Sequence, residues 1–206
     1  MSANNDRDAI LGRVRDALAP LEKRAPLPDW DREIVIMREA RGDVDAWSLF
    51  AARLKAVNGT PLDSVAGLVE LLEKNGWLHG YCDPALWPRL SKAFPVTFTV
   101  ETTFDRAHVD VYQFGITRAS GAIAETGTLI LSDASTSSRL AALAPWVHIG
   151  VISKGDLLID LPHAVEHFGS DPNVIWCTGP SKTADVEGIL IEDVHGPDVQ
   201  VTLLVD

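Results

Sequence analysis

From Thr60 onward, short apolar runs alternate with segments of helical periodicity, and this alternation limits the possible folds more than any other feature of the chain. Each apolar run has the length of one buried strand, and the helical segments between runs can carry the chain back to the start of a neighbouring strand. Strands joined in this way pair in parallel, and their connecting helices cover the two faces of the sheet. We therefore predict an α/β fold with a mostly parallel sheet and helices on both faces.

The expected elements follow from the spacing of apolar residues and from the positions of Gly, Pro and Asn. The predicted strands and extended segments cover residues 77–82, 94–101, 109–117, 121–124, 128–131, 147–152, 173–177 and 199–205. The predicted helices cover residues 6–18, 43–57, 64–74, 84–93, 135–143, 163–168 and 184–190.

The first of these helices stands apart from the alternating pattern. Its apolar residues recur at helical spacing and form one face, and prolines follow it at positions 20, 26 and 28. A proline-rich segment of this kind is extended and favours a linker. We predict an N-terminal helix and linker over residues 1–31 and an α/β domain over residues 32–206. The helix is either an appendage of the domain or a dimerisation arm.

The net charge of −11 bears on the partners of the chain. An acidic surface repels phosphate backbones and anionic lipids, and Lys and Arg are scattered along the sequence, so we expect neither nucleic acid nor a membrane as a partner. No window approaches the roughly 18 consecutive apolar residues of a spanning helix. The first residues lack the basic start and apolar run of a secretory signal. A cytoplasmic location is therefore expected.

The chain contains only two cysteines, Cys82 and Cys177. They are far apart and form no Cys-x-x-Cys pair, whereas an iron–sulfur cluster normally takes four thiolates. Cys177 lies in an apolar run, which favours a buried thiol over a reactive one. We expect no cofactor to be bound by this chain itself.

The segment from Thr178 to Glu187 has the residue types of an anion-binding turn. Gly179-Pro180 ends the preceding strand, and the predicted helix would then begin with free backbone N–H groups beside the positive charge of Lys182. The spacing is not that of a nucleotide-binding P-loop. The alternative is a strand-to-helix connection whose hydroxyl groups merely cap the helix. The candidate ligand-binding residues are Gly179, Pro180, Ser181, Lys182, Thr183, Asp185 and, in the nearby His-Gly-Pro turn, His195.

A second candidate site centres on the single carboxylate of Glu125, which lies among small residues. A nearby glycine lets a ligand approach closely, and a carboxylate at the end of a parallel strand would face the crevice where open α/β sheets bind ligands. Glu125 is the candidate catalytic residue, as a nucleophile, a base or a binding group. Its ligand-binding neighbours would be Thr126, Gly127 and Thr128. The alternative is a carboxylate that is satisfied by the adjacent threonine hydroxyls.

Other polar residues carry weaker signals. The run from His163 to His167 matches the H-x-x-E-H pattern of inverted zinc peptidases, but five-residue matches arise easily by chance, and we predict no metal site. His148 is either a hydrogen-bonded core residue or part of the crevice lining. Arg139 is a candidate second anion contact, and a solvated residue at a helix start is the stronger alternative.

Three motifs together resemble the LUD-domain family and, within it, the lactate utilization protein C subfamily. They are residues 115–128, residues 145–149, and residues 179–187 with the turn at 195–197, and they occur in the order typical of the family. The resemblance covers most of the chain and is strongest from residue 109 onward. Three motifs in the right order are far more specific than any one of them.

The resemblance implies a fold like that of the ribose-5-phosphate isomerase, glucosamine-6-phosphate deaminase and CoA-transferase group. It also implies a role in the oxidation of L-lactate to pyruvate, as an accessory or catalytic subunit beside partner proteins that carry iron–sulfur clusters. In this hypothesis Lys182 and the neighbouring amides bind a small carboxylate or a phosphate-bearing ligand, and Glu125 faces that ligand. The alternative hypothesis is a stand-alone isomerase or acyl/CoA-transfer enzyme that uses Glu125.

Overall fold

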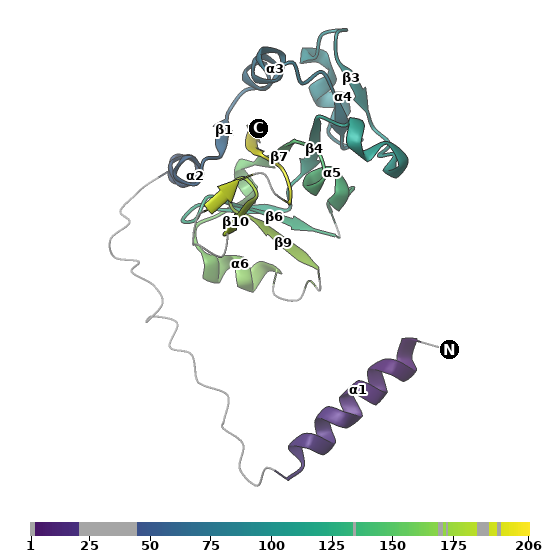
Figure 1. The fold of residues 1–206 in the computed structure, drawn as a ribbon. Coiled ribbons are helices and arrows are strands. Elements are labelled where there is room, and N and C mark those ends of the chain that lie inside the picture. The colour runs from purple at the N-terminus through teal and green to yellow at the C-terminus, as the bar shows by residue number, and fades with distance from the viewer. Residues whose placement is uncertain are drawn as a thin grey trace. The chain divides into compact units, whose positions relative to one another are not determined.

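The computed structural model of the protein describes residues 3–20, 45–133, 135–168, 171, 173–184, 190–192 and 195–206. The chain divides into two compact units, Met1–Gly42 and Asp43–Asp206. The smaller unit contains helix α1 (Ala3–Leu18), which confirms the helix predicted there (Figure 1). Its apolar residues Ile10 and Val14 are exposed. The predicted domain boundary after residue 31 falls outside the described residues and stays a prediction.

A six-stranded sheet, parallel throughout, forms the centre of the larger unit. Its strand order is β1-β12-β7-β4-β2-β3, so the last strand of the chain lies between β1 and β7. This parallel order confirms the predicted fold class. The bounds are Thr60–Leu62 for β1, Val199–Val205 for β12, Val147–Ser153 for β7, Phe114–Arg118 for β4, His79–Cys82 for β2 and Thr99–Glu101 for β3.

Helices α3 (Val65–Lys74) and α4 (Trp87–Leu90) pack against one face of this sheet, and the 3-10 helix η2 (Ser91–Ala93) follows α4. Alternate residues of each central strand point to this face, as the period of a β-strand requires. In β7 these residues are Val147 and Ile149, which are fully buried. The strongly apolar strand sequences are therefore explained by cover on both sides.

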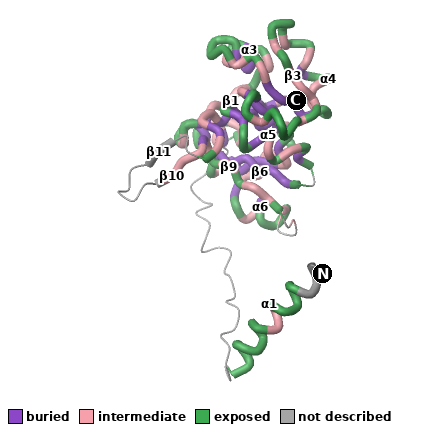
Figure 2. The backbone as a smooth tube through the Cα atoms, turned by 45° about the vertical axis from the view of Figure 1, so that its right-hand side comes forward, coloured by how far each residue is buried: buried purple, intermediate pink, exposed green. Residues whose placement is uncertain are grey.

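The opposite face is covered by a second, four-stranded sheet together with helices α2 (Ala46–Ala56) and α5 (Arg139–Leu143). In the order β8-β5-β6-β9, the β5–β6 and β6–β9 pairs are antiparallel. Figure 2 shows β6 as buried along its length. The bounds are Leu157–Leu158 for β8, Gly121–Ile123 for β5, Thr128–Ser132 for β6 and Val174–Cys177 for β9.

Two glycines of the main sheet allow this second layer to approach closely. A Cβ atom at Gly150 would lie 2.3 Å from Cδ1 of Leu129, and one at Gly115 would lie 1.8 Å from the carbonyl oxygen of Ala141 in α5. Helix α6 (Leu161–Phe168) packs on the small sheet with Ala164 buried. Helices thus cover both faces of the main sheet as predicted. The four-stranded sheet is an additional layer that the prediction did not include.

Two hairpins differ from the predicted architecture. Only residues 124–127 join β5 to β6, so Glu125 lies in a hairpin turn of the four-stranded sheet. Strand β5, which precedes this turn, pairs in parallel with β8 and antiparallel with β6, and it does not belong to the main sheet. Strand β10 (Lys182–Ala184) pairs antiparallel with β11 (Leu190–Glu192), so the helix predicted over residues 184–190 is wrong at both ends. Residues 185–189 lie outside the described residues. Cross-strand pairing of β-branched residues in this segment competes with the helical pattern and prevails.

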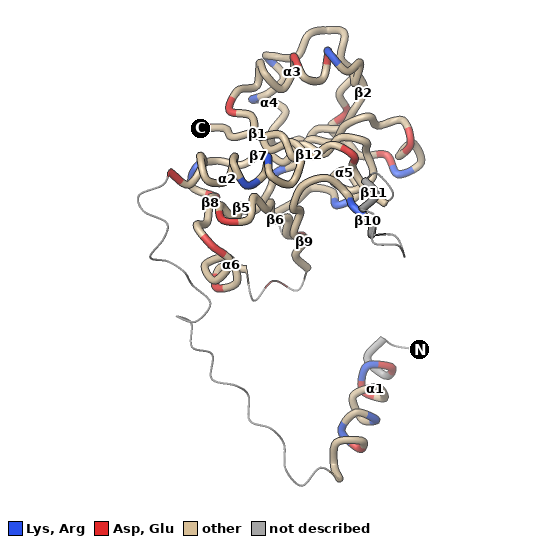
Figure 3. Tube along the Cα trace, turned by 60° about the vertical axis from the view of Figure 1, so that its left-hand side comes forward, with Lys and Arg blue, Asp and Glu red and all other residues tan. Residues whose placement is uncertain are grey.

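Charged side chains are dispersed over the larger unit. In the described residues, Lys and Arg are interspersed with Asp and Glu (Figure 3). No helix in this part of the chain is long and apolar enough to cross a membrane.

Candidate functional site

A pocket of about 410 Å³ brings together two of the predicted ligand-binding segments. Its walls include the segment from Thr178 to Lys182, which follows β9, and the turn from His195 to Pro197, which precedes β12. The end of α5, strand β9 and Gln200 complete the walls. Gln200 is the second residue of β12, so the pocket lies near the amino end of this parallel strand and not at the carboxyl end, where open α/β sheets usually bind ligands.

Backbone contacts hold these two segments together. Gly179 has a left-handed φ of 77°, and a Cβ atom there would lie 2.5 Å from the carbonyl oxygen of Val57. A glycine is therefore required where the turn passes the end of α2. The N–H of Ser181 donates to the carbonyl oxygen of Pro197 at 2.9 Å, which fixes the turn against the segment before β12.

The predicted helix-start amides are not available in the form expected. Ser181 uses its N–H for Pro197, and Lys182 begins a strand, so the helix-dipole part of the prediction is wrong. Thr183 pairs with Ile191 and does not line the pocket. Asp185 lies outside the described residues.

The charge of the pocket comes from side chains. Lys182 is partly buried, and its Nζ donates to the carbonyl oxygen of Val57 at 3.4 Å. His195 is exposed, and the hydroxyls of Thr178 and Ser181 add polar contacts. None of the described lining residues carries a carboxylate. The described lining of the pocket therefore combines one cationic side chain with hydroxyl groups.

A buried chain of hydrogen bonds extends from the pocket into the main sheet. Oε1 of Gln200 lies 2.9 Å from Nδ1 of His148, and Nε2 of His148 lies 2.8 Å from the hydroxyl of Thr117. All three side chains are buried. Of the two roles left open for His148, the core role is the observed one, and Gln200 connects it to the pocket. Sequence reasoning missed Gln200, although polar residues at alternate positions of the otherwise apolar β12 were an available signal.

Glu125 and Lys182 do not meet in this pocket. Oε1 of Glu125 accepts a hydrogen bond from the N–H of Leu161 at 2.7 Å, at the beginning of α6. A carboxylate at this position complements the positive end of the helix. Glu125 and its neighbours Thr126, Gly127 and Thr128 are not among the described lining residues.

Hydroxyl groups link the Glu125 turn to the pocket. The hydroxyls of Thr126 and Thr128 lie 2.7 Å apart, and that of Thr128 lies 2.8 Å from the hydroxyl of Thr178. Gly127 has a φ of 67° and packs against the backbone of Leu54 in α2. These hydroxyl contacts position Thr178 at the start of the pocket wall, and the Glu125 carboxylate does not line the pocket.

The remaining candidates have structural partners. Asp160 Oδ1 accepts the backbone N–H of His163 at 3.1 Å and lies 2.5 Å from its Nδ1. Nε of Arg139 lies 2.9 Å from a carboxylate oxygen of Asp133, and Arg139 does not line the pocket. No group of three or more His, Cys, Asp or Glu side chains in the described ranges could hold a metal ion. Burial raises the pKa of Cys82 to about 12 and that of Cys177 to about 11, so both thiols stay protonated.

Proteins with curated names are similar to part of the chain. The chain is 32% identical over 104 residues to lactate utilization protein C of Shouchella clausii, an alignment that covers 47% of the chain and 45% of the relative. It is 31% identical over 102 residues to lactate utilization protein C of Deinococcus radiodurans, covering 47% of the chain and 48% of the relative. The matches thus span about half the length of these relatives.

A solved structure and a family model extend this similarity to the fold and the domain. The crystal structure of a DUF162 family protein from Deinococcus radiodurans superposes with a TM-score of 0.55 at 23% identity, covering 78% of the chain and 96% of that structure. The model of the LUD domain matches residues 89–205, which is more than half of the chain and includes the whole pocket. The chain belongs to the LUD domain family.

Proposed function

We propose that the chain serves lactate utilization by binding a small organic acid, such as lactate or pyruvate, or a phosphate-bearing ligand in the pocket between the Thr178–Lys182 segment and the His195 turn. The names of the relatives support the metabolic role. The carrying observation is that Lys182 and two hydroxyl groups line this pocket, while no carboxylate is present among its described lining residues. Coulomb attraction in a partly buried site then favours an anionic ligand over a neutral one.

Oxidation of lactate to pyruvate removes two electrons and two protons, and the electrons need an acceptor. We assign the redox centres to partner proteins that carry iron–sulfur clusters, because this sequence has only two cysteines, whereas a cluster normally takes four thiolates. In this proposal the chain is an accessory or catalytic subunit that presents the organic acid.

A stand-alone isomerase or acyl-transfer enzyme would need the carboxylate of Glu125 to reach a substrate. In the structure this carboxylate accepts a hydrogen bond from the start of α6, and it does not line the pocket, so the geometry favours the subunit role. Turnover of a sugar phosphate or an acyl-CoA by the purified chain alone would reverse this preference.

Isothermal titration with L-lactate, pyruvate and inorganic phosphate tests the proposal. Lys182→Gln should weaken binding of the preferred anion about tenfold or more, since a hydrogen bond to a charged group contributes roughly 1.5–3 kcal/mol. Lys92→Gln is the matched control, because it removes the same charge from an exposed position outside the pocket. Equal affinity in the wild type and the Lys182 variant, or an equal loss in both variants, would contradict the pocket assignment.

A growth experiment tests the metabolic role separately. In a bacterial strain whose growth on L-lactate depends on this chain, Lys182→Gln should slow growth on L-lactate and leave growth on glucose unchanged. The Lys92 variant should support normal growth on both carbon sources. Normal growth of the Lys182 variant on L-lactate, with folded protein present, would contradict the role of the pocket in lactate utilization.

A further inference from the structure

We infer that Gln200 donates a hydrogen bond to the ligand in this pocket, and that His148 and Thr117 position Gln200 for that role. The inference rests on the proposed function, because it concerns the same pocket. It is carried by the hydrogen bonds that run from β12 through β7 to β4, and by the one amide hydrogen that these bonds leave unused.

The orientation of the Gln200 amide follows from its backbone neighbour. Its Nε2 lies 3.0 Å from the carbonyl oxygen of Val201, and a carbonyl oxygen can only accept a hydrogen bond. The NH₂ group must therefore face Val201, which leaves Oε1 to face His148 at 2.9 Å. Because Oε1 also only accepts, His148 carries a proton on Nδ1.

The protonation of His148 then determines the role of Thr117. Burial lowers the pKa of His148 to about 4, so the imidazole is neutral near pH 7. With its proton on Nδ1, the ring has a bare Nε2, which accepts a hydrogen bond from the Thr117 hydroxyl at 2.8 Å. The Thr117 hydroxyl thus supplies the donor that Nε2 needs in this tautomer, and Nδ1–H of His148 holds the Gln200 amide in its orientation.

One hydrogen of the Gln200 amide has no acceptor in the described part of the protein. The NH₂ group of Gln200 has two hydrogens, and the carbonyl of Val201 accepts one of them. The side chain is only 3% exposed, yet it lines the pocket. An unsatisfied buried N–H is costly, so the pocket should select a ligand that places an oxygen acceptor there.

The chemical class of the ligand follows from the two donors. Lys182 supplies a cation on one wall and Gln200 supplies a neutral N–H on another. A carboxylate, keto or phosphate oxygen satisfies the amide, whereas an ammonium group would leave it unpaired and would be repelled by Lys182. The pocket should therefore bind pyruvate and discriminate against alanine, which has an ammonium group in place of the keto oxygen.

Two threonines in one row of the sheet provide a matched test. Thr117 and Thr202 pair with the same residue, Gly150, from its two sides, and both side chains are fully buried. In the described residues the hydroxyl of Thr202 has no hydrogen-bond partner, whereas that of Thr117 contacts His148. Replacing either residue by valine keeps the shape and removes only the hydroxyl.

Titration with pyruvate should separate the two variants. Thr117→Val should weaken binding about fivefold, which corresponds to one net hydrogen bond, because Nε2 of His148 loses its donor and the imidazole then holds the Gln200 amide less firmly. Thr202→Val should leave the affinity within about twofold. Gln200→Met removes the donor itself and should cost about tenfold and reduce the preference for pyruvate over alanine. Equal effects of the two threonine variants, or an unchanged preference in Gln200→Met, would overturn the inference.

The failure of the inference differs from the failure of the proposed function. If the wild type binds pyruvate and Lys182→Gln weakens binding but Gln200→Met does not, only the role of Gln200 is wrong. If the wild type binds none of the three anions, the proposed function fails and this inference fails with it. Nitrogen-15 NMR of the imidazole of His148 adds a readout that needs no ligand. A proton on Nε2 instead of Nδ1 would overturn the positioning role.

Discussion

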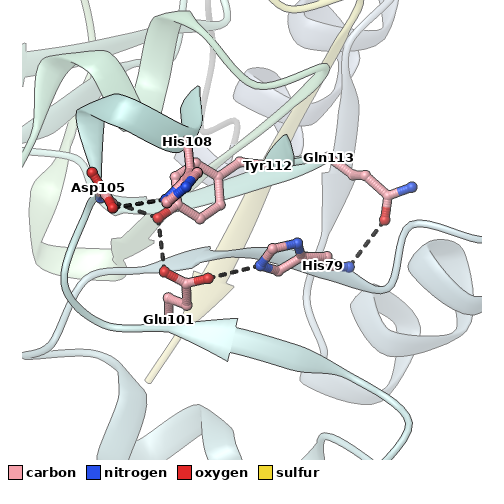
Figure 4. Close-up of polar contacts among 6 residues, drawn as sticks. All are labelled: His79, Glu101, Asp105, His108, Tyr112 and Gln113. Carbon is pink, nitrogen blue, oxygen red and sulfur yellow. Dashed lines mark hydrogen bonds and ion pairs between the residues drawn. The ribbon is translucent and has the colours of Figure 1, made fainter. Parts of the chain in front are cut away.

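Two histidines on the same face of the main sheet are held in opposite ways. His148 lies in β7 at the centre of the sheet and is fully buried, and its two ring nitrogens lie within hydrogen-bond distance of the neutral side chains of Gln200 and Thr117. His79 begins β2 next to the edge strand, is 30% exposed, and its Nε2 lies 2.8 Å from Oε1 of Glu101 (Figure 4). The sheet thus combines a neutral histidine network at its centre with a charged one near its edge.

The edge network is larger and more exposed. Tyr112 donates its hydroxyl to Oε2 of Glu101 at 2.8 Å and accepts the N–H of Asp105 at 3.0 Å, at the start of the 3-10 helix η3 (Arg106–Val111). Hydrogen bonds from His79 and Tyr112 lower the pKa of Glu101. Figure 4 shows His79, Glu101 and Tyr112 pointing toward one another, and they come from β2, from β3 and from the residue after η3. The network therefore ties the edge strand to the rest of the sheet.

The difference shows that the place of a histidine in the sheet decides which hydrogen-bond partners it can have. A charge at the centre of the sheet would lose its hydration, so the central histidine stays neutral and is held by dipoles. Near the edge, water solvates the Glu101 carboxylate, so a carboxylate partner of His79 is tolerated but adds little stability. The central network should therefore contribute strongly to the free energy of unfolding and to ligand binding. The edge network should contribute little to the free energy of unfolding.

The largest expected effect is loss of the central imidazole. His148→Ala should lower the free energy of unfolding by about 3 kcal/mol, because it leaves a cavity and two buried polar groups without a partner. His79→Ala, the edge counterpart, should cost less than about 1 kcal/mol. Urea denaturation at pH 7 measures both values. Equal losses would break the comparison between centre and edge.

Acid should act on the two networks in different pH windows. The pKa of His148 is about 4 in the folded state and 6.5 without burial, so the unfolded state binds a proton first as the pH falls. The contribution of His148 is therefore fully present above pH 6.5 and is lost between pH 6.5 and about 4. The shift corresponds to a loss of about 3 kcal/mol.

The edge carboxylate titrates later. The pKa of Glu101 is lowered from 4.5 in the folded state, so its contribution is present above pH 4.5 and is lost as the pH falls below that value. Urea denaturation between pH 8 and pH 4 should give a flatter profile for His148→Gln than for the wild type. Glu101→Gln should follow the wild-type profile above pH 5. Parallel profiles for wild type and His148→Gln would contradict the assignment.

A smaller effect should distinguish the two buried threonines. Thr117→Val should lower the free energy of unfolding by about 1–2 kcal/mol, because Nε2 of His148 loses its buried donor. Thr202→Val should leave stability unchanged or raise it by up to about 1 kcal/mol, since it removes a buried hydroxyl that has no partner among the described residues. Thermal and urea unfolding test this pair. A larger loss for the Thr202 variant would contradict it.

The smallest effect is expected at the edge. Glu101→Gln should cost less than about 1 kcal/mol at pH 7, because the carboxylate is 41% exposed and solvent screens its attraction to His79. The difference from wild type should shrink further in 1 M salt, where screening is stronger. A loss that is large and independent of salt would place the edge network in the same class as the central one.

Much of the fold could be predicted because buried strands and helices have recognisable patterns of apolar residues in the local sequence. Strands β7 and β12 are near-continuous apolar runs, and β12 has the predicted bounds, 199–205. The Ser64 cap marked the start of α3. Strand β1 escaped prediction because it has only three residues and includes Pro61. The β10–β11 hairpin escaped because its segment also has helical spacing, and only pairing decides between the two.

The candidate site was predicted in part for the same reason. The Gly179-Pro180 and Gly196-Pro197 turns are local signals, and the structure places both at one pocket. Glu125 lies in the turn between β5 and β6 of the four-stranded sheet and not at the strand ends of the main sheet, and the short connection after β5 was an available signal for this hairpin. The contact of His148 with Gln200, 52 positions away, depends on the register of two strands. No local pattern records that register.

Residue order and spacing thus established the α/β class, most of the strands and helices, and the turns that line the pocket, because each depends on neighbours within a few positions. The neutral state of His148, the partner of each polar side chain and the location of the pocket at the amino end of β12 depended on folding in three dimensions. Hydration and hydrogen bonding are decided by what surrounds a group, and for these residues the surroundings come from distant parts of the chain.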